Sequence, residues 1–168
     1  MKAFVNFFLV LWTFTRIISV GANGQAQTKG SPPVITFSYA QEKIRQGEEW
    51  RIYISASDPD GDMSKIYCAI DQPGGQPYRP DVTRLKKGME EKFSGYLFLR
   101  TNSQFSLQGV SLTLTLIVAD RAGNESKPVV FPLTFDGEPM KPLPPDMEKD
   151  LNRRIGAIGI DLIRRDAW

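Results

Sequence analysis

The stretch SLTLTLIVADRAGNESKPVVFPLTF, residues 111–135, decides the fold. Apolar and polar residues alternate from Ser111 to Val118, and the alternation returns from Val129 to Phe135. A period of two places one face of a β-strand on a core and the other in water. The intervening Ala122-Gly123-Asn124 has the composition of a tight turn. The stretch therefore predicts two β-strands with a turn between them.

Four earlier stretches predict strands of the same kind. They run from Ile35 to Tyr39, from Trp50 to Ala56, from Ile66 to Ile70 and from Tyr96 to Leu99. Turn signals separate most of them, and no long helical stripe interrupts the series. Residues 76–94 carry mixed charge and two prolines, which indicates a solvated loop with a short edge strand near Val82. We therefore predict an all-β fold, an antiparallel β-sandwich over residues 32–136.

The composition excludes several classes of protein. The chain has 168 residues, no histidine and a single cysteine. The lack of histidine removes the commonest general base at neutral pH and most zinc ligand sets. One cysteine cannot form an internal disulfide, and Cys68 is expected to be a small buried residue of the third strand. We therefore expect a protein that is not an enzyme and has no catalytic residues.

The first 22 residues are typical of an export signal. Lys2 precedes an apolar run from Ala3 to Phe14 that is too short to span a bilayer, and the small residues near Ala22 suit cleavage. We predict a signal peptide at 1–22, a flexible linker at 23–31, and a periplasmic, extracellular or cell-surface location. Removing residues 1–22 leaves 19 basic against 19 acidic residues. A neutral chain has no overall field for a polyanion, so we expect no nucleic-acid partner.

Three motifs of the predicted sandwich form a recognisable set. They are Pro33-Val34-Ile35, the DPDGD turn at 58–62, and VADRAGNES at 118–126. Together they resemble bacterial immunoglobulin-like and cadherin-like domains of exported proteins, and the resemblance covers residues 32–136. It implies an immunoglobulin-like sandwich that acts as a spacer, an adhesive module or an assembly partner. The second cysteine and the third-strand tryptophan of antibody domains are missing, so only the broad superfamily is implied.

Acidic turns are expected to meet at one end of this sandwich, which we call the Asp pole. If the strands run up and down in order, the turn after the second strand and the turn before the last strand lie at the same end. Five side chains would then converge: Asp58, Asp60, Asp62, Asp120 and Asn124. Carboxylates repel unless a cation bridges them, and Ca²⁺ is the natural candidate outside the cytosol. Alternatively, these residues shape tight turns by bonding their own backbone.

Tyrosines offer a second kind of site. A platform for stacking sugars would form if Tyr53, Tyr67, Tyr78 and Tyr96 shared one outer face. That arrangement would make the chain a carbohydrate- or peptidoglycan-binding module. Tyrosines scattered over different faces would be packing residues instead.

The composition changes after Phe135. A Pro-rich spacer at 137–145 precedes an amphipathic α-helix predicted at 146–168, whose apolar stripe is Leu151, Ile155, Ile158 and Leu162. Such a helix has to bury its stripe against its own sandwich, a partner protein or a membrane surface. Five basic and five acidic residues in the segment make the membrane the weaker option. We predict an assembly or adaptor subunit that binds an envelope or surface protein through this helix.

Overall fold

The fold was obtained as a computed structural model, which describes residues 30–74, 78–101, 106–137, 139, 141, 151–160 and 162. The predicted signal peptide and all but the last two residues of the predicted linker lie outside the described residues. So do residues 142–150 and 163–168 of the C-terminal segment. Within the described ranges, no helical segment has both the length and the apolar character that crossing a bilayer requires.

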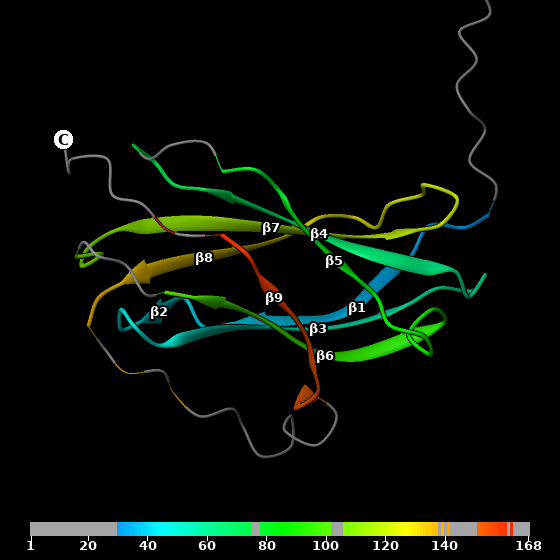
Figure 1. The fold of residues 1–168 in the computed structure, drawn as a ribbon, viewed down its shortest axis with the longest axis horizontal. Coiled ribbons are helices and arrows are strands. Elements are labelled where there is room, and N and C mark those ends of the chain that lie inside the picture. The colour runs from blue at the N-terminus through cyan, green and yellow to red at the C-terminus, as the bar shows by residue number, and fades with distance from the viewer. Residues whose placement is uncertain are drawn as a thin grey trace, which may run out of the picture.

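Two β-sheets pack face to face (Figure 1). Sheet A contains β1 (Val34–Ala40), β3 (Glu49–Ser57), β6 (Lys92–Arg100) and β9 (Arg154–Ile158), in the order β1-β3-β6-β9. Sheet B contains β2 (Lys43–Ile44), β4 (Met63–Asp71), β5 (Asp81–Arg84), β7 (Ser111–Asp120) and β8 (Val129–Phe135), in the order β2-β8-β7-β4-β5. All six strands that the alternation predicted are present, and β5 is the predicted edge strand.

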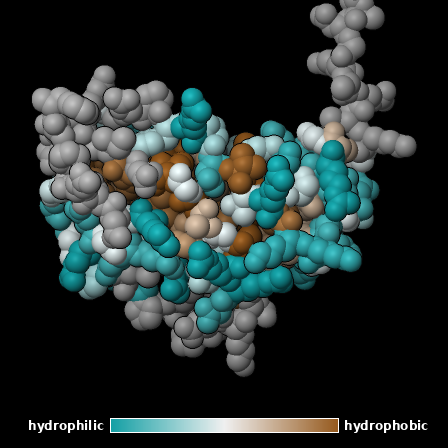
Figure 2. Space-filling model, in the orientation of Figure 1, coloured by the Kyte–Doolittle hydropathy of each residue, from teal (hydrophilic) through white to brown (hydrophobic). Residues whose placement is uncertain are grey.

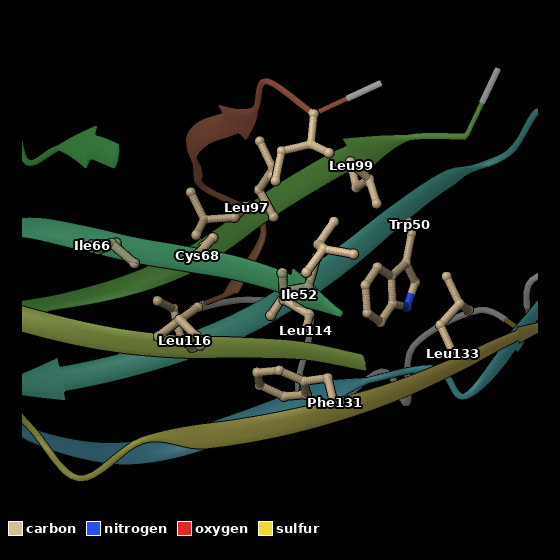
Figure 3. Close-up of a cluster of buried hydrophobic side chains, with 14 of the residues drawn as sticks. Trp50, Ile52, Ile66, Cys68, Leu97, Leu99, Leu114, Leu116, Phe131 and Leu133 are labelled. Atoms are coloured by element: carbon tan, nitrogen blue, oxygen red, sulfur yellow. The ribbon is translucent and has the colours of Figure 1, made fainter. Parts of the chain in front are cut away.

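The core lies between the two sheets and consists of the apolar positions of the alternating stretches. Figure 3 shows side chains of β3 and β6 pointing toward side chains of β4, β7 and β8. Trp50 is fully buried, and its Nε1 donates to the carbonyl oxygen of Gln41 at 2.8 Å. Cys68 is buried as predicted, and burial raises the pKa of its thiol to about 12, so the reactive thiolate is disfavoured.

Both sheets are mixed, which corrects the prediction of a purely antiparallel sandwich. Strand β2 runs parallel to β8, and β9 runs parallel to β6, whereas the other pairs are antiparallel. Strand β2 exists because the chain crosses from sheet A to sheet B between Ala40 and Lys43. Its two residues are too few to produce a detectable alternation.

The predicted C-terminal helix is wrong over Arg154–Ile158, because these residues form strand β9. Glycines allow this strand to fit against its neighbours. A side chain on Gly95 of β6 would collide with the carbonyl group of Arg153, and a Cβ on Gly156 would lie 2.7 Å from Cγ2 of Thr83. Glycine costs a helix about 1 kcal/mol relative to alanine, yet it permits this close approach of two backbones.

The four residues assigned to a partner-binding stripe are buried within the chain. Leu151, Ile155, Ile158 and Leu162 are between 4% and 6% exposed, and the last three belong to the core between the sheets. Strand β9 contacts β6 of sheet A and β5 of sheet B, so it closes the flank of the sandwich that faces the viewer in Figure 1. Figure 2 shows apolar surface gathered on this flank, with hydrophilic side chains around it. The stripe is therefore part of the fold in this structure.

Neighbouring residues of β9 should differ sharply in their tolerance of substitution. Ile158 is 4% exposed whereas Ala157 is exposed, so Ile158→Ala should lower the free energy of unfolding by about 2–5 kcal/mol. Ala157→Ser should change it by less than about 0.5 kcal/mol. Urea unfolding of the two variants measures the contrast. Unchanged stability in Ile158→Ala would contradict the packing of β9 on the sandwich.

Candidate metal site

Three acidic side chains meet at the Asp pole, and each comes from the end of a core strand. Asp58 follows β3, Asp62 precedes β4 and Asp120 ends β7. One carboxylate oxygen from each residue lies within 4.8 Å of the other two. Backbone pairing holds the loops together, because the amide of Arg121 donates to the carbonyl oxygen of Asp62 at 3.0 Å. The structure therefore brings three of the four acidic residues that the sequence singled out within reach of one ion.

The remaining two residues of the pole hold the loops in shape. The Asn124 side chain donates from Nδ2 to Oδ2 of Asp120 at 2.7 Å, and the Asn124 backbone amide donates to Oδ1 at 2.8 Å. Asp60 uses its Oδ2 to accept from the amide of Ser31 at 2.5 Å. Its own amide donates to Oδ1 of Asp58 at 3.0 Å. These bonds are the turn chemistry predicted as the alternative, and they place Asn124 directly against Asp120.

The hydrogen bonds of the turns do not reach every carboxylate oxygen at the pole. Asp58 is 1% exposed, and its Oδ2 has no hydrogen-bond partner among the described residues. Oδ1 of Asp62 is also buried and also without such a partner. A buried charged oxygen without a partner is costly, because it has lost its hydration and gained nothing in return. A cation beside these two oxygens would supply the missing interaction.

The pKa of Asp62 reflects the same crowding of carboxyl groups. Its desolvation by burial raises the pKa of this carboxyl group, and the contact with the Asp58 carboxyl and the negative charge of Asp120 raise it further. The folded chain alone thus holds a proton on Asp62 more tightly than the unfolded chain does. A cation at the same place would reverse the preference, because it favours the charged form.

The donor set fits a hard divalent cation. Ca²⁺ takes six to eight oxygen ligands at about 2.3–2.6 Å, so oxygens up to roughly 5 Å apart can touch one ion. The three carboxylates of Asp58, Asp62 and Asp120 satisfy that limit and offer no nitrogen or sulfur. Zinc and copper sites favour those softer donors. The pole therefore has the chemistry of a calcium or magnesium site.

The tyrosines do not form the platform that a sugar would need. Tyr53 and Tyr96 share the outer face of sheet A with Tyr39, with ring centroids 6.3 Å (Tyr39–Tyr53) and 5.7 Å (Tyr53–Tyr96) apart. Their planes are tilted by 34° and 51°, and Tyr53 is 6% exposed. Tyr67 lies on β4 of sheet B, and the hydroxyl of Tyr78 donates to Oε1 of Gln72 at 2.7 Å. The structure thus brings two of the four predicted tyrosines together.

Two arginines on this outer face were missed by the sequence analysis. The guanidinium carbon of Arg51 lies 4.9 Å from the ring centroid of Tyr96, and that of Arg154 lies 4.2 Å from the ring centroid of Phe98. Alternation along β3 signals that Arg51 and Tyr53 share a face, but the cross-strand register that adds Tyr96 and Phe98 cannot be read from one stretch.

Comparisons with known proteins give little further information. No protein-family model matches the chain, and no curated protein sequence matches it. Among solved structures, the chain is similar to the SrpA adhesin of Streptococcus sanguinis, a crystal structure of a point mutant, with 20% sequence identity and a TM-score of 0.39. That match covers 64% of this chain and 57% of the adhesin chain, so this chain spans little more than half of that neighbour.

Calcium should stabilise the protein measurably. At a calcium concentration one hundred times the dissociation constant, linkage adds about 2.7 kcal/mol to the free energy of unfolding, which raises Tm by several degrees. Thermal melts in millimolar calcium and in chelator measure the difference. Identical melts would leave the turn chemistry as the whole explanation of the pole.

The stability of the Asp62→Asn variant relative to the wild type should change sign between chelator and calcium. In chelator the variant should be more stable than the wild type at neutral pH, because the raised pKa makes the wild type lose stability as pH rises through the folded-state pKa of Asp62. In calcium the wild type should be more stable, because the variant has lost a charged ligand. Melts at acid and at neutral pH test both statements. The same ranking in both conditions would contradict a cation at Asp62.

Proposed function

We propose that the chain is a non-enzymatic, immunoglobulin-like interaction module of an exported protein, and that one calcium ion orders its Asp pole. The observation that carries the proposal is the group of three carboxylates with two buried oxygens that no described residue satisfies. Outside the cytosol calcium is abundant enough to fill such a site. Export rests on the sequence of residues 1–22, which has the charge and length of a signal peptide.

The strand order supports the immunoglobulin-like part of the proposal. Immunoglobulin sandwiches place strands A, B, E and D in one sheet and strands C, F and G in the other. Strands β1, β3 and β6 of sheet A occupy the places of A, B and E, while β4, β7 and β8 of sheet B occupy those of C, F and G. Strand β9 lies in the place of D, although it runs parallel to its neighbour.

The chemistry of the described residues supports a role without catalysis. The carboxylates of the pole crowd within 4.8 Å and belong to closed turns. Two-carboxylate glycosidases instead need an open cleft that holds a substrate between their acids. A cavity of about 300 Å³ lies elsewhere, beside the end of β1. Its described lining is Tyr39, Ala40, Gln41, Glu42, Lys43, Pro139 and Lys141, which includes one carboxylate.

A bound cation would connect the pole to the chain that precedes the sandwich. The amide of Ser31 bonds to Asp60, and the amide of Asp60 bonds to Asp58 of the group of three. Fixing Asp58 therefore fixes the point at which the chain enters β1. A fixed segment before β1 would help an interaction module in a longer assembly, because less orientational freedom is lost when the module binds its partner.

Affinity capture from the native envelope fraction tests this function. The tagged full-length protein should retain the same partner proteins in calcium and lose most of them in chelator. Asp120→Asn should behave in calcium as the wild type does in chelator, whereas Asp71→Asn, at the other end of β4, should behave as the wild type. If the same partner proteins are captured in calcium, in chelator and with Asp120→Asn, the result contradicts a cation-ordered interaction module.

A further inference from the structure

We infer that the outer face of sheet A is the docking surface for an acidic segment of a partner protein; this rests on the proposed role as an interaction module. The surface, which we call the aromatic-arginine face, exposes Arg154 and parts of Tyr39, Arg51 and Tyr96, beside the rings of Tyr53 and Phe98, which are only 6% and 1% exposed. It is distinct from the Asp pole and adjoins the flank that β9 closes, because β9 supplies Arg154. Its residues point away from the core, because their strand neighbours Ile52, Ile54, Leu97 and Leu99 are buried between the sheets.

The aromatic part of this face is ordered before any partner binds. Tyr53 is directly opposite Tyr96 across the β3–β6 pair and directly opposite Tyr39 across the β1–β3 pair. The three rings therefore form one row over three strands, with Tyr39 and Tyr96 half-buried at its ends. Rigid aromatic side chains supply contact area at little cost in conformational entropy, which is why tyrosine is enriched at protein interfaces.

The two arginines are held in place by the rings. Arg51 lies over Tyr96, and Arg154 lies over Phe98, in each case less than 5 Å from the ring centroid. Arg51 uses its Nε to bond Oε1 of Glu49 at 3.1 Å. Arg154 is exposed, and none of the ion pairs formed by described residues includes it. A stacked guanidinium keeps its N–H groups at the edge of the plane, where they can hold a carboxylate by two parallel bonds.

The charge of the face defines its partner. The charged side chains on this side of sheet A are Glu49, Arg51, Lys92, Arg100 and Arg154, four positive and one negative. Such an excess attracts carboxylates and repels a basic segment. A stacked sugar fits less well, because the rings are tilted against one another and Tyr53 is nearly covered. The aromatic-arginine face thus combines carboxylate anchors with apolar contacts, which suits a peptide that alternates acidic and apolar residues.

Fluorescence anisotropy with the calcium-loaded full chain tests the inference. The probe is a fluorescein-labelled eight-residue peptide of alternating glutamate and leucine, and a lysine-leucine peptide is its charge-reversed control. We expect the acidic probe to bind and the basic probe not to bind. The variant with Arg51→Gln and Arg154→Gln should bind the acidic probe about tenfold or more weakly. Arg154→Lys keeps the charge but not the two parallel bonds, so its affinity should fall between the two.

A matched control variant lies on the outer face of sheet B. Lys65→Gln with Arg84→Gln removes two adjacent positive charges from β4 and β5, where the two residues are paired, and should leave binding unchanged. An equal loss in both double variants, no binding of the acidic probe, or equal binding of the basic probe would overturn the inference. Binding of the protein to vesicles that contain anionic lipid, without binding to the acidic peptide, would also overturn the inference. A calcium titration of the same variants shows whether the Asp pole still binds calcium, so a loss of peptide binding can be told apart from a loss of calcium binding.

Discussion

The crowding of three acidic side chains at the Asp pole is the constraint that the surrounding loops have to accommodate. Four parts of the chain meet there: residue 31 before β1, the β3–β4 turn, the β5–β6 loop and the β7–β8 turn. Backbone bonds from Asp58 to Glu91 and from Met63 to Glu90 join the first turn to the β5–β6 loop. Because the turns come from both sheets, a cation bound by Asp58, Asp62 and Asp120 would tie sheet A to sheet B at this end of the sandwich.

Close apolar packing is the second constraint, and it covers one flank of the sandwich with strand β9. Strand β9 is short and contains Gly156, yet its isoleucines complete the core beside Leu97 and Thr83. This position makes the C-terminal segment part of the packing of the sandwich. The aromatic-arginine face lies next to it, and Arg154 of β9 is one of its two carboxylate anchors. Folding of the C-terminal segment therefore also completes the inferred docking surface.

The sequence predicts local features well and edge pairings poorly. Alternation identified the strands with enough residues to show it, including β7 and β8, but β2 has two residues and no pattern. The spacing of Leu151, Ile155, Ile158 and Leu162 suits a helix, and what makes Arg154–Ile158 a strand is the free edge of β6 beside Gly95. At the pole, the turns and acidic residues were predictable. The approach of Asp58, Asp62 and Asp120 to one point, and the bonds that Asp60 and Asn124 make to them, could be seen only in the folded loops.

The most direct test of the account is isothermal titration calorimetry of calcium into the chelator-stripped protein. We expect one calcium ion per chain, with binding abolished in Asp58→Asn and retained in Asp71→Asn. We also expect that binding weakens as pH falls, because a proton on Asp62 competes with the ion. No binding in the millimolar range, or the same binding in Asp58→Asn as in the wild type, would contradict the central claim that the Asp pole is a cation site.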